Sequence, residues 1–527
     1  MKVDFSSMTL REKVLQTFVT NLHMIKRVGS LEKFFRQYPV GGIYFSKGSV
    51  ADLAGLMESG TITSADFIKE CRCFSKYPLL VCADGANIEN GLHVDFRALS
   101  ACFDEGLAYE AGKVLGIQMR YHDIDWILGP CIDLSLDRNA DMFSGAVTDD
   151  AEYNARLYAQ VTKGIQDQGI AATAKHFPGQ GTYHVNFHYS MGQNIMDMKT
   201  WMDTVGMCYR RQFQQDCMSV MTSHMMLRAW AEEGDNGYPP IATYSTKITM
   251  DLLKKELGFK GAVVTDALIM GGMGCGDQVK EAVQAFKSGA DLLLWPPMES
   301  LDIIVEQLES GEIPMERLED ALERIQRMRG FIEEGKKNAV IPDAEYVDTT
   351  CRRMIGGGIE LRRNHTDVIP LKAGETGKLL VIGNAPDERR MEPIRIFSKR
   401  LEKRGFDVSF QEYLLTCWQE EINEIIAPYE YVIIVLNHPF AVGCFERCAS
   451  TTWAANLVAP EKKIIINFSS SYLSDDYYLN DSVVINANQS INEESIDEVL
   501  DRLTGEKAFT GRTPLKLNDE AWNKRQP

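Results

Sequence analysis

The chain has 527 residues, of which 45% are hydrophobic and 25% are charged, a composition typical of a soluble globular protein with more than one domain. Its formal net charge of −18 argues against the generally basic surface that binds nucleic acid or anionic membranes. The first residues lack the apolar core of a signal peptide, and no apolar run reaches transmembrane length, so we expect a cytoplasmic protein.

The 12 cysteines fit a cytoplasmic location, because most of them stand singly in apolar segments, as Cys131 does. The two close pairs are Cys71 with Cys73 and Cys444 with Cys448. Neither pair has the CxxC spacing of a zinc site, so we expect neither a metal nor another cofactor.

The chain opens with a predicted helix. Thr9 and Glu12 form a capping box, and apolar residues through Leu22 follow with helical spacing. Beyond this helix the predicted strands are 41–45, 79–84, 124–130, 170–176, 218–224, 261–266 and 290–295. The predicted helices are 61–75, 104–120, 149–168 (capped by Thr148 or Asp149), 198–214, 245–258, 277–288 and 299–335.

This strand–helix alternation predicts an α/β fold with a parallel sheet. The number of units in residues 1–335 favours a closed (β/α)8 barrel of the TIM type. An open, doubly wound sheet is the alternative, although no GxGxxG turn follows the first predicted strand.

Residues 336–372 are predicted to be a linker around one helical segment. A second α/β unit follows in residues 373–527, with a helix at 493–503 and strands at 378–383, 406–410, 431–436, 463–468 and 482–487. Five strands in a segment of this length predict a smaller, open α/β sandwich domain.

Polar residues stand at the carboxyl ends of several predicted strands of the first unit: Asp84, Lys175, His176, His224 and Asp266. A barrel brings these ends together in one mouth, so residues far apart in the sequence would face a single pocket. Asp266 is a candidate nucleophile for an electrophilic carbon, and the cap of the following turn is its alternative role.

Each of the other strand-end residues has a functional and a structural interpretation. Lys175 and His176 can donate hydrogen bonds to a hydroxyl-rich or anionic ligand, or form an ion pair behind the pocket. Asp84 can accept hydrogen bonds from two sugar hydroxyls, or cap a turn. His224 is a candidate ligand-binding residue, with a core histidine as the alternative.

The strand 170–176 continues into a loop that contains His184 and His188. Both are candidates for general acid/base catalysis, because imidazole titrates near neutral pH. Since histidines are also common on protein surfaces, a solvated loop without a catalytic role is the alternative.

Two segments resemble glycoside hydrolase family 3, in its β-N-acetylhexosaminidase branch. Residues 175–181, Lys-His-Phe-Pro-Gly-Gln-Gly, resemble the KHFPGHG signature of that branch, and residues 258–270 resemble the segment that carries the family's nucleophile. Segments 9–13, 40–43, 78–84 and 129–133 fit the same family in the same order. The resemblance covers the first 335 residues, and the second unit matches the family's C-terminal domain more loosely.

The resemblance implies a retaining mechanism in which Asp266 is the nucleophile and His188, on the loop after the signature, is the general acid/base. In this branch the catalytic histidine belongs to an Asp-x-His dyad. The resemblance also implies that Asp84, Lys175 and His176 are sugar-binding positions. Together with His224, the candidate at another strand end, they form the predicted substrate-binding set.

The sequence departs from the family pattern in the acid/base dyad and at positions that recognise the sugar. Asn186 replaces the aspartate of the dyad, and Gln180 replaces the second histidine of the signature. Residues 138–143, Arg-Asn-Ala-Asp-Met-Phe, lack an arginine at the place that matches the family's Arg-Ser-Phe element, and the loop after Asp84 lacks the Glu-Gly-Gly of the branch.

Three functions follow from these observations. The first is a retaining exo-β-glycosidase that hydrolyses terminal β-N-acetylhexosaminides. The second is a β-glycoside phosphorylase, because Asn186 removes a negative charge that would repel phosphate. The third is a catalytically impaired sugar-binding homologue. In each case we expect a small carbohydrate partner, no nucleic acid and no membrane, and the sequence leaves a homodimer open.

Overall fold

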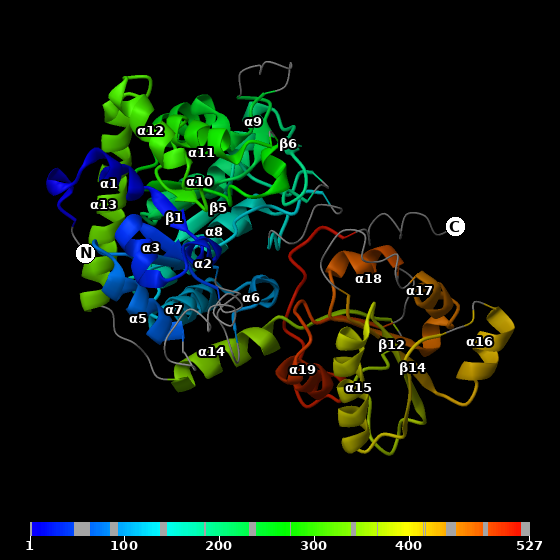
Figure 1. Ribbon diagram of the computed structural model, residues 1–527. Coiled ribbons are helices and arrows are strands. Elements are labelled where there is room, and N and C mark those ends of the chain that lie inside the picture. Colours follow the sequence, from blue (N-terminus) through cyan, green and yellow to red (C-terminus); the bar gives the residue numbers. More distant parts are fainter. Residues whose placement is uncertain are drawn as a thin grey trace.

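The computed structural model describes residues 3–46, 64–84, 93–137, 145–183, 186–230, 239–274, 276–338, 344–365, 367–414, 416, 418–438, 449–477 and 483–517. They form an N-terminal unit, coloured blue to green in Figure 1, and a C-terminal unit, coloured yellow to red. Both units alternate strands with helices, which confirms the predicted α/β class. None of the helices in these ranges combines the length and apolar composition needed to cross a membrane.

Eight short parallel strands form the centre of the N-terminal unit, in sheets of order β10-β1-β2-β3-β4 and β5-β7-β9. Their bounds are β1 (Phe18–Thr20), β2 (Gly42–Tyr44), β3 (Leu80–Ala83), β4 (Trp126–Ile127), β5 (Thr173–Phe177), β7 (Ser219–Thr222), β9 (Ala262–Thr265) and β10 (Leu293–Leu294). Single parallel bridges join Trp126 to Ala171 and Val264 to Leu292, so the two sheets meet at both edges. A separate parallel pair consists of β6 (Gly192–Asn194) and β8 (Met225–Leu227).

Helices connect these strands. They are α1 (Leu10–Leu15), α2 (Leu22–Val28), α3 (Leu31–Gln37), α5 (Ser64–Phe74), α6 (Phe96–Cys102), α7 (Glu105–Tyr121), α8 (Ala151–Gln166), α9 (Met198–Asp203), α10 (Val205–Gln214), the π-helical segment η6 (Lys247–Glu256), α11 (Gln278–Lys287), α12 (Ser300–Glu309) and α13 (Met315–Asn338). Every residue of β1, β2, β3, β7 and β9 is buried, as expected for parallel strands covered on both faces.

Two predictions in the N-terminal unit need correction. The capping box of Thr9 and Glu12 is present, but α1 ends at Leu15 and the following apolar residues form β1. A strand buried on both faces shows no alternation, so its residues fit helical spacing equally well. Asp150, rather than Thr148 or Asp149, caps α8, because its side chain accepts the Tyr153 N–H at 3.0 Å.

The C-terminal unit is built on a six-stranded sheet of order β11-β16-β15-β14-β12-β13. The strands are β11 (Glu360–Asn364), β12 (Leu379–Asn384), β13 (Val408–Gln411), β14 (Tyr431–Leu436), β15 (Lys463–Asn467) and β16 (Val483–Asn486). The five predicted strands are confirmed as β12 to β16. β11 lies within residues 336–372 and pairs with β16 as the antiparallel edge strand.

The helices of this part are α14 (Ala344–Gly357), α15 (Glu388–Lys403), α16 (Gln419–Ile426), α17 (Ala449–Asn456), α18 (Ser471–Tyr477) and α19 (Glu493–Leu503). After α19 the chain returns towards the N-terminal unit (Figure 1), where the Thr148 hydroxyl donates to the Pro514 carbonyl at 2.6 Å. The Tyr472 hydroxyl at the start of α18 donates to the Ser135 carbonyl at 3.4 Å. The two units are therefore in direct contact near the loop that follows β4.

Candidate active site

Four of the predicted site residues lie together where strands of the N-terminal unit end. Lys175 and His176 belong to β5, whereas Asp84 follows β3 and Asp266 follows β9. The Lys175 ammonium donates to Asp84 Oδ1 at 2.8 Å, and His176 Nε2 lies 4.0 Å from Asp266 Oδ2. The fold therefore assembles two carboxylates, an ammonium and an imidazole in one cluster, although they are widely separated in the sequence.

Asp266 is held in place directly after a buried strand. Its Oδ1 accepts the N–H of Ala267 at 2.8 Å, while its side chain keeps 15% of its surface exposed. Burial by itself raises the pKa of Asp266, but His176, and after it His224 and Lys175, more than compensate, so the pKa lies below its ordinary value. The carboxylate is therefore ionised and accessible, as a nucleophile must be.

His176 is oriented by Asp133, a carboxylate that the sequence interpretation did not single out. Asp133 Oδ2 lies 2.8 Å from His176 Nδ1, and Asp133 Oδ1 accepts the backbone N–H of Gln180 at 2.8 Å. The Asp133 side chain is completely buried. It therefore fixes the imidazole so that Nε2 points towards Asp266. The Gln180 side chain is itself buried, and its backbone makes this contact.

Lys175 forms the ion pair that was the structural alternative for this residue. Asp84 accepts from it through Oδ1 and from the Tyr44 hydroxyl, at 3.1 Å, through Oδ2. Burial lowers the pKa of Lys175, but Asp84 and then Asp266 outweigh burial and raise it, so the ammonium stays charged. Because the Asp84 side chain is 33% exposed, its carboxylate also remains accessible to a ligand.

His188 and Asn186 form the expected pair on the loop after β5. His188 Nδ1 lies 2.9 Å from Asn186 Oδ1, and the same oxygen accepts the His188 backbone N–H at 2.9 Å. Since an amide oxygen only accepts hydrogen bonds, Nδ1 carries a proton and Nε2 of the exposed ring is left to exchange one. The His188 carbonyl accepts the N–H of Gly271, which ties this loop to the one that follows Asp266. His184 lies outside the described residues.

His224 is completely buried, unlike the other candidates. Its Nδ1 lies 2.9 Å from the Thr243 hydroxyl oxygen and its Nε2 lies 3.1 Å from the Ala267 carbonyl oxygen. Burial lowers the pKa of His224, which favours the neutral ring. Both ring nitrogens are thus occupied by protein groups, and this geometry fits the core-histidine alternative better than ligand binding.

Two predicted recognition segments, the loop after Asp84 and residues 138–143, lie outside the described residues.

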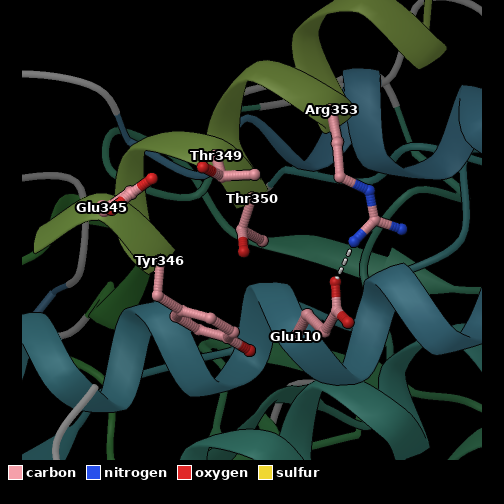
Figure 2. A pocket seen from close by; sticks show the side chains of 6 residues that line it. All are labelled: Glu110, Glu345, Tyr346, Thr349, Thr350 and Arg353. Carbon is pink, nitrogen blue, oxygen red and sulfur yellow. Dashed lines mark hydrogen bonds and ion pairs between the residues drawn. The ribbon is translucent and has the colours of Figure 1, made fainter. Parts of the chain in front are cut away.

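A separate cavity of about 290 Å³ lies between α7 and α14 (Figure 2). In it the Arg353 guanidinium donates to Glu110 at 2.5 Å. The lining consists of Glu110, Glu345, Tyr346, Thr349, Thr350 and Arg353. None of these residues belongs to the strand-end cluster, so this cavity is distinct from the candidate active site.

The sequence matches a known family over most of the N-terminal unit. The family model described as "Glycosyl hydrolase family 3 N terminal domain" matches residues 9–328, and the chain belongs to this family. It is therefore a glycoside hydrolase. The chain is 27% identical over 399 residues, 70% of its length and 68% of the relative's, to a "Beta-N-acetylglucosaminidase/beta-glucosidase" of Cellulomonas fimi. It is 27% identical over 286 residues, 50% of its length and 75% of the relative's, to a "Beta-hexosaminidase" of Nitrosospira multiformis.

The similarity of this fold to solved structures extends over both units of the chain. "Beta-glucoside phosphorylase BglX" matches with a TM-score of 0.82 and 20% identity, covering 99% of this chain and 96% of its own. A glycoside hydrolase family 3 β-N-acetylglucosaminidase from Paenibacillus matches with a TM-score of 0.77 and 23% identity, covering 97% of this chain and 99% of its own. At these identities the similarity concerns the fold.

Proposed function

We propose that the protein is a retaining exo-β-glycosidase that hydrolyses terminal β-N-acetylhexosaminides through a covalent intermediate on Asp266. The observation that carries this proposal is the ionised, partly exposed Asp266 carboxylate beside His176 and Lys175. Membership of the family and the names of its curated relatives support the substrate class.

In the proposed mechanism Asp266 attacks the anomeric carbon while the bond to the leaving oxygen breaks. His188, as imidazolium, gives its Nε2 proton to that oxygen, and a glycosyl-enzyme forms. His188 then removes a proton from water, which attacks the same carbon, releases the sugar and frees Asp266. Lys175, His176 and Asp84 bind the sugar hydroxyls, and Asp133 positions His176.

A second candidate function is phosphorolysis of the same intermediate. The Asn186–His188 pair favours it, because the neutral amide of Asn186 lacks the negative charge with which the aspartate of the family's dyad would repel phosphate. The similarity to a structure named as a β-glucoside phosphorylase is in line with this candidate. In that case phosphate replaces water in the second step, and the product is a sugar 1-phosphate.

We also propose the architecture that accompanies this function. The eight strands of the N-terminal unit would close into a (β/α)8 barrel in residues 1–335, because the two sheets already meet at both edges. Residues 336–372 would connect the two domains and also supply β11 to the sheet of the second one, and residues 373–527 would form the rest of the α/β sandwich domain.

The test is a panel of aryl β-glycosides of N-acetylglucosamine, glucose and xylose, assayed with and without phosphate. Preferential release of N-acetylglucosamine supports the first candidate, whereas a sugar 1-phosphate as main product replaces it with the second. Binding of these sugars without turnover of any glycoside would contradict both.

The nucleophile assignment is tested separately with Asp266→Ala. We expect turnover to fall by at least about 10³-fold, because the covalent step is lost. Added azide should partly restore turnover by taking the place of the carboxylate, giving a glycosyl azide of inverted configuration. Undiminished hydrolysis would exclude Asp266 as the nucleophile.

A further inference from the structure

Three potential metal ligands meet within the candidate active site. One ligand atom each of Cys131, Asp133 and His176 lies within 4.8 Å of the other two. The Cys131 thiol donates to Asp133 Oδ2 at 3.3 Å, and His176 Nδ1 lies 2.8 Å from the same oxygen. A single carboxylate oxygen therefore accepts hydrogen bonds from a thiol and an imidazole, both of which bind metal once their protons are displaced.

The backbone explains why these three side chains meet. Cys131 forms a parallel bridge with Lys175, and the Ile132 N–H donates to the Lys175 carbonyl at 2.8 Å. This pairing places the segment that carries Cys131 and Asp133 beside the end of β5, where His176 follows Lys175. The ligands come from two strands, so no CxxC spacing reveals them in the sequence.

We propose that Cys131, Asp133 and His176 form a Zn²⁺ site whose occupation inhibits the enzyme. A thiolate, an imidazole nitrogen and a carboxylate oxygen are the ligand types that Zn²⁺ prefers, and three protein ligands leave a fourth position for water. In a tetrahedral zinc site, bonds of about 2.0–2.3 Å separate ligand atoms by about 3.3–3.6 Å. The two distances to Asp133 Oδ2 are slightly shorter, so those two pairs need to move apart by only a few tenths of an ångström to about half an ångström. The Cys131 and His176 ligand atoms lie within 4.8 Å of each other, so this pair needs to approach by at most about 1.3 Å.

The surrounding charge also favours a cation. The carboxylates of Asp133 and Asp266 lie on either side of His176, and Asp84 lies beyond Lys175. Only one of these residues, Lys175, carries a fixed positive charge. The His176 side chain is 12% exposed, so one of the three ligands borders solvent.

Occupation of the site changes the state of His176. Zn²⁺ displaces the thiol proton of Cys131, which leaves to solvent, and forms a bond to the sulfur. The Nδ1 proton moves to Nε2 of a neutral ring, or leaves to solvent from a charged ring, and Nδ1 binds the metal. The hydrogen bond that Asp133 makes to Nδ1 is then lost, and a divalent charge lies near Asp266. Both changes weaken nucleophilic attack, so inhibition follows from the geometry.

The binding test uses Co²⁺ as a probe, because a cobalt–thiolate bond gives a charge-transfer absorption in the near ultraviolet. We expect this band at one equivalent in the full-length protein and its loss in Cys131→Ser and Cys131→Ala. Cys217→Ser is the matched control, because this buried thiol belongs to the same unit and lies outside the cluster. Absence of the band, or its persistence in both Cys131 variants, would overturn the proposal.

The functional test measures turnover of the preferred aryl glycoside against Zn²⁺, followed by addition of a chelator. We expect reversible inhibition of the unchanged protein. Cys131→Ser should need at least about tenfold more Zn²⁺ than the unchanged protein for the same degree of inhibition. Equal inhibition of both proteins would exclude an inhibitory role for this site. The cobalt titration needs no substrate, so a failure of the proposed glycosidase function would leave its result decisive.

Discussion

The charges around Asp266 determine the pH range in which its carboxylate is available. Burial raises its pKa, but His176, then His224 and Lys175, together hold that pKa below the ordinary value. A depressed pKa means that the carboxylate becomes protonated only at a lower pH than a solvated aspartate. Asp266 should therefore be fully ionised near neutral pH, and its own protonation should limit the rate only in strong acid.

Removal of the nearby ammonium tests this electrostatic interpretation. Lys175→Met should raise the pKa of Asp266, so the acidic limb of the kcat/KM profile should move to higher pH by about 1 unit. Lys163→Met is the control, because Lys163 on α8 forms an exposed ion pair with Asp167. An acidic limb that stays in place in Lys175→Met would show that the charge of Lys175 does not influence the pKa of Asp266.

The Asn186–His188 pair makes a second prediction at the same scale. Asn186→Asp adds a negative charge that stabilises the imidazolium, so hydrolysis should rise by about tenfold. The same charge should repel phosphate and raise the ratio of free sugar to sugar 1-phosphate. Both products are measured in one assay, with Asn423→Asp on α16 as a control. An unchanged rate and product ratio would argue against His188 as the acid/base.

Single residues differ in how far the sequence reveals them. Asp84, Lys175, His176 and Asp266 could be predicted because each stands where an apolar strand ends, and parallel strands bring such ends together. Asp133 also stands after a strand, but its partner His176 is 43 residues away, and nothing in the spacing indicates that they pair. The core position of His224 was likewise open until its contacts were known.

At the scale of elements, the hydrophobic pattern predicts long buried strands well, and very short strands or edge strands of a sheet less well. The strands β12, β14, β15 and β16 appear in the sequence as apolar runs, because they are buried in the sheet. The edge strand β13 alternates apolar and polar residues, which are only half-buried. β1 was absorbed into a predicted helix because three buried residues carry no period of their own. β11 was missed because Glu360–Asn364 is largely polar, as an antiparallel edge strand can be.

Gly181 joins two loops of the candidate site and could not be replaced without moving them. Its φ is +89°, and a Cβ added there would lie 1.7 Å from the Leu134 carbonyl oxygen. The Gly181 carbonyl accepts the N–H groups of Leu136 and Asp137 at 3.0 and 2.9 Å. This close approach holds the segment containing Asp133 against the loop that follows His176.

Gly181→Ala should therefore impair both stability and activity. We expect a loss of about 2–4 kcal/mol in the free energy of unfolding, from positive φ and from the clash, with a lower kcat/KM. Gly258→Ala is the matched control: its φ is +72°, but an added Cβ meets nothing within 4 Å, so only about 1 kcal/mol should be lost. Denaturant unfolding and kinetics of both variants decide this, and equal losses would contradict the role given to the Leu134 contact.

At the scale of the whole molecule, the C-terminal unit reaches the candidate site through the loop after β4. Tyr472 contacts Ser135, two residues after Asp133, and Thr148 binds the chain after α19 through Pro514. The Ser135 N–H also donates to the Thr148 carbonyl at 2.9 Å. The sequence could predict two units, but their contact depends on side chains more than 300 positions apart, which no local pattern indicates.

This contact predicts that the C-terminal unit supports the geometry of the site. Tyr472→Phe removes a hydrogen bond worth about 1 kcal/mol, so kcat/KM should fall by up to about fivefold while the fold is retained. The effect should appear in kcat/KM measured well below the unfolding temperature, because the loop that carries Asp133 and thereby His176 loses one of its supports. Tyr431→Phe is the control, because Tyr431 begins β14 and lies at the opposite end of the strands from α18. Equal kinetics of the two variants would mean that the units touch without influencing the site.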